Sequence, residues 1–210
     1  MSQFNEMSRR AFLALPLLLA TMPATAGEPP VVGRISRLVG APSVLAVGAA
    51  AKPATPGMTL HEGDRVVTGP GARLEIVGAD GTSLTIGERT TVVLTHFLLP
   101  TEARRGRGLL ELLEGIMRIE LPRSWDRFEV KTPTAVASAR STPWLIEATA
   151  GDTAVFVSEG SVQVVNRTGA GAVLLYPRFG TDVGRDGLPM TPMRWGQARV
   201  DAALARTRIP

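Results

Sequence analysis

The sequence predicts an all-β protein with many short strands, arranged as a stacked or rolled β-sandwich or a short β-solenoid-like module, and a short C-terminal α-helix. Three observations predict this class. Apolar and polar residues alternate in runs rich in Val, Ile, Leu and Thr, which is typical of half-buried strands. Gly, Pro or Asp ends each run, and the 22 glycines and 16 prolines favour many turns. The last residues instead have the apolar spacing of a helix.

The absence of cysteine restricts the class of protein further. Disulfide scaffolds, thiolate zinc sites, iron–sulfur clusters and Cys nucleophiles are excluded. With 210 residues, 44% of them hydrophobic, the chain has enough apolar side chains for one domain with a core. We therefore expect β packing alone to stabilise the fold.

The first element in chain order is a predicted cleaved signal peptide over residues 1–26. A basic start, a short apolar run and a small-residue end at residues 24–26 have the layout of such a signal. Residues 8–13 read Ser-Arg-Arg-Ala-Phe-Leu, which resembles the twin-arginine export signal of bacteria; an ordinary secretory signal is the alternative. We expect a mature chain that begins near Gly27, is periplasmic or secreted, and does not span the membrane.

Period-two alternation predicts thirteen strands in the mature chain. Asp80 and Gly81 form the strongest hairpin signal, because both tolerate the positive φ of a two-residue turn. Glu-Gly precedes a strand at residues 62–63, 114–115 and 159–160, where each glycine is expected at a turn or bulge. The predicted strands cover residues 33–39, 43–47, 65–68, 73–77, 83–86, 91–94, 116–121, 128–131, 135–138, 145–148, 154–157, 162–165 and 173–176.

Four segments break this pattern. We expect a surface loop over residues 49–59, an Arg-rich turn with a short helix or strand over 101–113, and an extended connector over 180–193. Helix formers and apolar spacing predict an amphipathic helix over 194–206, packed on the β body or on a partner.

The predicted elements divide the chain into three parts. The signal peptide occupies residues 1–26, the β domain residues 27–183, and the extended connector with the C-terminal amphipathic helix residues 184–210.

Several strings in the β domain resemble the FecR-type domain of bacterial envelopes, in an order that covers residues 31–183. Residues 63–74 (GDRVVTGPGARL) and 80–87 (DGTSLTIG) are similar to its first half, and residues 132–137 (TPTAVA), 140–142 (RST), 155–157 (VFV) and 159–164 (EGSVQV) to its second half. Ser141 stands where the family usually has Gly in an R-G-T turn, so a turn with positive φ would be strained or reshaped there.

This resemblance implies an extracytoplasmic β-rich module. The family is best known from sensors that relay the state of an outer-membrane receptor to a sigma factor. Those sensors carry a cytoplasmic anti-sigma segment and a membrane helix ahead of the domain, where this chain has a cleavable signal. We therefore expect a stand-alone exported protein that does not itself bind a cytoplasmic sigma factor.

The formal charge of +4 does not indicate a nucleic-acid-binding protein. Nineteen acidic residues accompany the 23 basic ones, and aromatic residues make up only 5% of the chain. Arg104, Arg105 and Arg107 form the one cluster of arginines. We expect no nucleic-acid partner.

The sequence predicts no catalytic residues, no cofactor and no metal site. The aspartates beside glycines suit turns rather than proton transfer. His61 and His96 have no second histidine or carboxylate at ligand spacing. The glycine-containing strings lack the strand-to-helix context of a nucleotide site. We therefore expect a protein that is not an enzyme.

The candidate contact residues are arginines and tryptophans, which suit interfaces. Trp125 is expected in a polar turn, Arg140 at the turn that resembles R-G-T, and Trp195 at the start of the tail helix. The full candidate set is Trp125, Arg140, Arg104, Arg105, Arg107 and Trp195.

The leading hypothesis is a non-enzymatic periplasmic FecR-like protein, a protein-interaction or sensing module in envelope signalling. It would bind an envelope component through strand edges and loops. The alternative is a protein that binds a cell-wall or surface polysaccharide through Trp125 and the arginines of residues 104–107. An exported hydrolase or cofactor enzyme is supported only by the resemblance to a twin-arginine signal.

Overall fold

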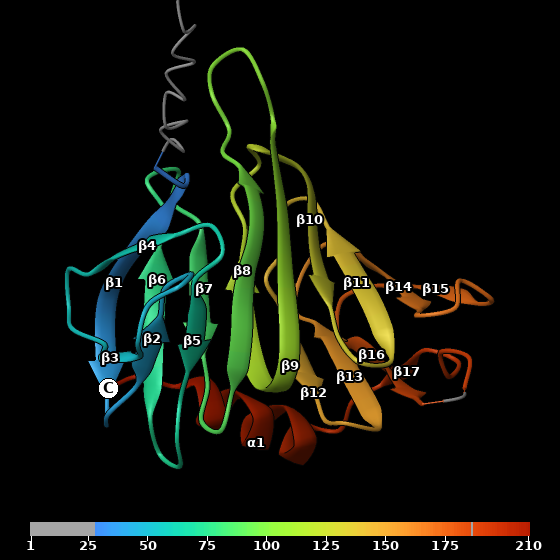
Figure 1. Ribbon diagram of the computed structural model, residues 1–210. Helices are drawn as coiled ribbons and strands as arrows, with labels where there is room; N and C mark the ends of the chain where they lie inside the picture. The colour runs from blue at the N-terminus through green and yellow to red at the C-terminus, as the bar shows by residue number, and fades with distance from the viewer. Residues whose placement is uncertain (1–27, 186) are drawn as a thin grey trace, which may run out of the picture.

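A single long strand, β9 (Gly106–Glu120), joins two β layers in the computed structural model, which describes residues 28–185 and 187–210 (Figure 1). The first part of β9 pairs with β8 (Thr91–Leu98) and β10 (Trp125–Lys131). The second part pairs with β7 (Ser83–Ile86) and β12 (Trp144–Ala148). The strand therefore belongs to both layers.

The first layer has the strand order β3-β2-β5-β8-β9-β10-β11-β14-β15. All neighbours are antiparallel except the parallel pair β9 and β10. Its other strands are β2 (Ser43–Leu45), β3 (Lys52–Pro53), β5 (Arg65–Val67), β11 (Ala135–Ala139), β14 (Val162–Asn166) and β15 (Ala172–Leu175).

The second layer is antiparallel throughout its described strands, in the order β4-β1-β6-β7-β9-β12-β13-β16-β17. Its other strands are β1 (Val31–Val39), β4 (Thr59–His61), β6 (Arg73–Val77), β13 (Asp152–Val157), β16 (Phe179–Gly184) and β17 (Met193–Arg194).

The main core lies between these layers and draws alternate residues from both. Leu74 and Ile76 on β6 and Phe128 and Val130 on β10 are fully buried and belong to one hydrophobic cluster. Because successive side chains of a strand point to opposite faces, the residues between them face outward. This alternation turns Arg127 and Glu129 toward solvent on the outer face of the first layer.

Gly115 lies where β9 passes from the first layer to the second. Its φ is +102°, a conformation that glycine adopts far more readily than other residues. A Cβ on Gly115 would lie 2.6 Å from the carbonyl oxygen of Arg89 and would also overlap Thr90. Glycine is therefore required here both by the backbone conformation and by the close approach of the neighbouring chain.

Helix α1 (Gln197–Thr207) covers part of the outer face of the second layer (Figure 1). The helix packs on a separate apolar cluster, and polar contacts hold the carboxyl-terminal end of the helix in place. The Nε of Arg73 donates to the carbonyl oxygen of Arg206 at 2.9 Å, and the Arg206 guanidinium pairs with Glu147 and, at 3.9 Å, with Glu88. The cluster consists of Ile116, Leu145, Phe156, Trp195 and Ala203.

Substitution of Trp195 by Ala is expected to detach α1 while leaving the two layers folded. Trp195 stacks on Phe156 with ring centroids 5.1 Å apart, and the guanidinium of Arg199 lies 3.7 Å from its ring centroid. We expect a loss of about 2 kcal/mol in the docking free energy of the helix. Hydrogen exchange should accelerate in residues 197–207 and not in β10; equal acceleration in both would contradict separate docking.

The fold class predicted from the sequence is confirmed, whereas several element boundaries were wrong. Strand β3 lies within the predicted loop 49–59, and β4 begins at its end. Residues 106–120 form one continuous strand, whereas the sequence predicted a turn with a short helix or strand over 101–113 and a strand that begins at 116. Backbone pairing with neighbours distant in sequence extends these strands, and short-range alternation does not reveal such pairing.

The C-terminal part also differs from the prediction. Strands β16 and β17 occupy parts of the segment expected as a connector, because β13 offers β16 a free antiparallel edge. The helix begins at Gln197, so Trp195 precedes it. The predicted signal peptide lies outside the described residues.

Candidate functional site

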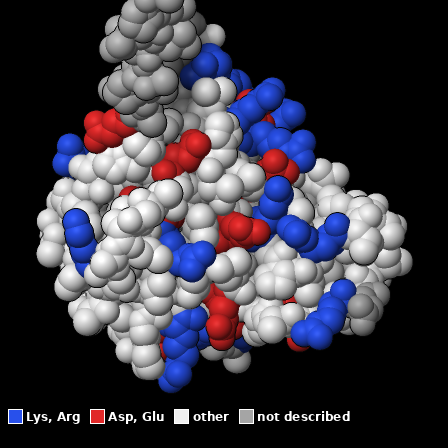
Figure 2. Space-filling view, viewed as in Figure 1, with Lys and Arg blue, Asp and Glu red and all other residues white. Residues whose placement is uncertain are grey.

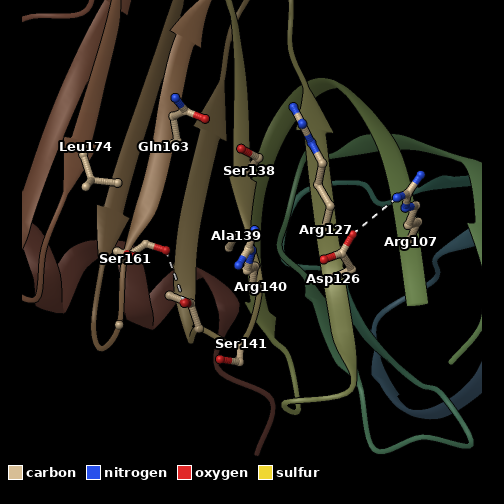
Figure 3. Close-up of a pocket in the computed structure, with 12 residues that line it drawn as sticks. Arg107, Asp126, Arg127, Ser138, Ala139, Arg140, Ser141, Ser161, Gln163 and Leu174 are labelled. Atoms are coloured by element: carbon tan, nitrogen blue, oxygen red, sulfur yellow. Dashed lines mark hydrogen bonds and ion pairs between the residues drawn. The ribbon is translucent and has the colours of Figure 1, made fainter. Parts of the chain in front are cut away.

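A shallow groove of about 570 Å³ crosses the outer face of the first layer. Figure 3 shows its lining side chains rising from neighbouring strands, with Arg107 on β9 at one end and Leu174 on β15 at the other. Strands β10, β11 and β14 lie between these ends. The groove therefore runs across five strands rather than along one.

Strand register brings the basic side chains of the groove together. Arg127 on β10 pairs directly with Arg107 on β9. A register irregularity between Trp125 and Arg127 lets Trp125 enter the core while Arg127 remains exposed. Arg140 follows the last residue of β11, which pairs with β10 on the other side. Three arginines are thus gathered from segments up to 33 positions apart in the sequence.

The charges of the groove are only partly neutralised. The Nη2 of Arg107 lies 3.5 Å from the Oδ2 of Asp126, and the Nη2 of Arg127 donates to the Oε1 of Glu129 at 2.8 Å. Within the described residues, Arg140 makes no ion pair or side-chain hydrogen bond and is exposed. Figure 2 shows basic and acidic side chains interspersed over the face in view. Arg140 is therefore available for an anionic group.

Two turns form one wall of the groove. The Oγ1 of Thr142 donates to the carbonyl oxygen of Ser161 at 3.3 Å. Gly160 has a φ of +73°, and a Cβ there would lie 2.6 Å from the Oγ1 of Thr142. Among the non-glycine residues that the structure describes, only Arg89 and Arg178 have positive φ. Ser141 therefore occupies its turn without backbone strain, and the turn does not need glycine.

Of the predicted contact residues, the structure brings Arg107 and Arg140 into the groove. Arg104 and Arg105 are exposed in the loop between β8 and β9, and neither lines the groove. The Nη2 of Arg104 donates to the carbonyl oxygen of Leu99 at 3.4 Å, a hydrogen bond within the same loop. The clustered arginines of the sequence thus separate in the fold.

Trp125 is a core residue, which corrects its expected place in a polar turn. It begins β10 and is only 1% exposed. Its Nε1 donates to Asp80 at 2.7 Å and to Thr82 at 2.8 Å. Because the side chain is enclosed and its donor is bonded within the protein, we assign it no direct partner contact.

Trp195 is also largely covered. It is 7% exposed and lies beneath α1 on the second layer, opposite the groove. Its contacts with Phe156 and Arg199 explain its burial. We therefore take it as a packing residue of the helix.

Sequence reasoning missed Arg127, Asp126 and Gln163, which all line the groove. A signal for Arg127 was present, because it adjoins the apolar Phe128 in an alternating strand and must point the other way. Its proximity to Arg107 depends on the parallel pairing of β9 with β10, and its proximity to Arg140 on the antiparallel pairing of β10 with β11. Local patterns do not predict either pairing.

Within residues 28–185 and 187–210, no group of three or more His, Asp or Glu side chains could hold a metal ion. Over the same residues, none of the helical structure has the length and apolarity required to cross a bilayer.

A polar cluster on the second layer gives a pH-dependent contribution to stability. Burial alone would raise the pKa of Glu75, but hydrogen bonds from Arg37, Ser36 and Ser83 outweigh it and lower the pKa below its ordinary value. Its Oε2 accepts from Ser36 at 2.6 Å and from Arg37 at 3.0 Å, and its Oε1 from Ser83 at 3.0 Å. The folded state therefore favours the ionised carboxylate.

We expect Glu75 to stabilise the fold at neutral pH and to lose this contribution in acid. A lowered folded pKa gives stability that is present above the pKa of the unfolded chain and is lost as pH falls through the folded pKa. Glu75→Gln should cost about 1 kcal/mol at pH 7. Urea unfolding should show that the difference in unfolding free energy between the wild-type protein and Glu75→Gln becomes smaller from pH 7 to pH 3. A constant difference would contradict the assignment, and Glu102→Gln, in an exposed loop, is the control.

The structure is an all-β, two-layer domain with a polar groove on one outer face. Residues 64–163 match the family described as "FecR protein". This match agrees with the FecR-type resemblance of the sequence motifs and covers 100 of the 210 residues.

Solved structures support the fold. Two crystal structures of a "putative anti-sigma factor" from Parabacteroides distasonis ATCC 8503, at 1.65 and 2.50 Å resolution, each match with a TM-score of 0.54, at 19% and 22% identity respectively. The matches cover 67% of this chain and 64% and 63% of those chains, so the similarity extends over less than two thirds of their length. At this identity the likeness concerns the fold. Among curated proteins, none matches this chain.

Proposed function

We propose that this chain is a non-enzymatic interaction module of the bacterial envelope that acts in signalling by binding another envelope protein. One observation carries the proposal: of the groove residues, all except Leu174 lie within the segment matched by the FecR family. The part of the chain that resembles the family is thus the part that builds the exposed binding surface. The groove offers charged and hydroxyl groups at fixed positions, which suits recognition of a protein surface.

The proposed location rests on the predicted signal peptide and on the family. Double substitution of Arg9 and Arg10 by Lys should block export if the twin-arginine route is used. Cell fractionation should then show the uncleaved precursor in the cytoplasm, whereas the wild-type chain should appear in the periplasm with an N-terminus near Gly27. Normal export of the variant would favour the general secretory route.

Affinity capture from envelope extract tests the proposed activity. The wild-type protein should retain a specific protein that Arg140→Gln retains less well. Arg65→Gln removes the same charge from an exposed position on β5, away from the groove, and should behave as wild type. Failure of the wild-type protein to retain any envelope protein would contradict the proposal, as would equal retention by both variants.

The groove has few of the features that the polysaccharide alternative requires. That alternative depended on Trp125 and on the arginines of residues 104–107 as contacts. Trp125 is buried in the core, and of these arginines only Arg107 lines the groove. No aromatic residue is among those lining the groove, so the groove has no flat apolar platform for a sugar ring.

A further inference from the structure

We infer that the groove binds an extended acidic peptide segment of the partner protein. This inference rests on the proposed function and specifies the chemistry of the partner. Its lining residues contain three arginines and one aspartate, and Glu129 pairs with Arg127 from beside the groove, so the net formal charge is still positive. A guanidinium binds carboxylates through two parallel hydrogen bonds, so the groove is suited to ligands that carry them.

Arg140 is the first anchor for the peptide. It is exposed, and it has no ionic partner within the described part of the chain. A carboxylate that reaches Arg140 therefore displaces only water. Arg107 and Arg127 form a second anchor on paired positions of β9 and β10. The 3.5 Å contact of Arg107 with Asp126 is long for an ion pair, so a ligand carboxylate can compete with it.

The other lining groups favour a peptide over other polyanions. Ser138 and Gln163 lie on directly paired positions of β11 and β14, and their hydroxyl and amide groups can bond to peptide N–H and C=O groups. Leu174, which is 46% exposed, gives an apolar contact at the far end. Proteins that bind single-stranded nucleic acids stack successive bases on aromatic side chains, and the lining residues include none.

The dimensions of the groove set the length of the segment. Five neighbouring strands span four spacings of about 4.8 Å, or about 19 Å. An extended chain rises about 3.3 Å per residue, so the groove accommodates about six residues. We expect acidic side chains near Arg140 and between Arg107 and Arg127, with an apolar side chain at Leu174.

A labelled synthetic hexapeptide of five glutamates and a terminal leucine is the probe, and fluorescence anisotropy is the measurement. At about 50 mM salt the wild-type protein should bind it at least about 10-fold more tightly than the peptide with glutamines in place of glutamates. Arg140→Gln should weaken binding about 5- to 10-fold, and Arg65→Gln less than about 2-fold. Ser138→Trp places a large side chain in the groove without changing its charge, and this variant should abolish peptide binding.

Three results would overturn the inference. The first is equal affinity for the two peptides, and the second is equal weakening by Arg140→Gln and Arg65→Gln. The third is groove-dependent binding of polygalacturonate, an acidic polysaccharide, without binding of the peptide. Circular dichroism and thermal unfolding of each variant establish that it is folded. If the wild-type protein captures an envelope protein but not the acidic peptide, the proposed function stands and this inference fails.

Discussion

Substitution of Gly115 by Ala is expected to destabilise the protein by about 3–5 kcal/mol, the largest effect of any single methyl group that we predict. Two causes add. An alanine at a φ of +102° is strained, and its Cβ would lie 2.6 Å from the carbonyl oxygen of Arg89. Because β9 pairs with β7, β8 and β12 around this point, the strain cannot relax without breaking pairs in both layers.

A matched variant separates the two causes. Gly57 has a φ of +83° and open space where a Cβ would be placed, so Gly57→Ala measures the backbone cost alone, about 1 kcal/mol. Urea unfolding at pH 7 gives the free energy of unfolding for both variants. Similar losses for Gly57→Ala and Gly115→Ala would contradict the close packing of Gly115 against Arg89 and Thr90.

Substitution of Trp125 by Ala is expected to cost about 3–5 kcal/mol, because it removes a large buried side chain and leaves a cavity. Trp125 makes edge-to-face contacts with Phe97 and Phe128, at centroid distances of 6.5 and 5.1 Å. It also ties β10 to the hairpin of Asp80, whose carboxylate accepts its Nε1 donor at 2.7 Å. The substitution should therefore destabilise both layers.

The variant Trp125→Phe distinguishes packing from hydrogen bonding. It keeps an aromatic ring in the core but removes the donor to Asp80 and Thr82, for an expected cost of about 1–3 kcal/mol. Chemical denaturation with intrinsic fluorescence from the remaining tryptophans measures both variants. A loss below about 1 kcal/mol for Trp125→Ala would place this side chain outside the core, in conflict with its 1% exposure.

The alternation of residues was sufficient to predict the fold class and most individual strands. In β6 and β14, for example, apolar residues at every second position face the core as expected. Alternation was insufficient for β3 and β17, which have two residues each. Strands this short exist because a neighbouring strand presents an edge, and that information is not local in sequence.

The candidate site could be predicted only in part for the same reason. Arg107 and Arg140 were identified from a cluster and a turn, but Arg104 and Arg105 lie outside the groove. Trp125 was misplaced because Pro122, Arg123 and Ser124 before it suggested a polar turn, whereas the register irregularity in β10 turns its ring inward. The pairing between strands, not the composition, determines which arginines lie together in the groove.

The strand shared by the two layers also determines how this protein can fold. Strand β9 pairs with β7 and β12 in the second layer and with β8 and β10 in the first. Neither layer is therefore complete before β9 has formed. Its pairing with β12 and the packing of α1 on Ile116 connect residues far apart in the chain. Such long-range contacts are associated with slow folding. The two layers should therefore form and melt as a single cooperative unit, with β9 in the nucleus of the transition state.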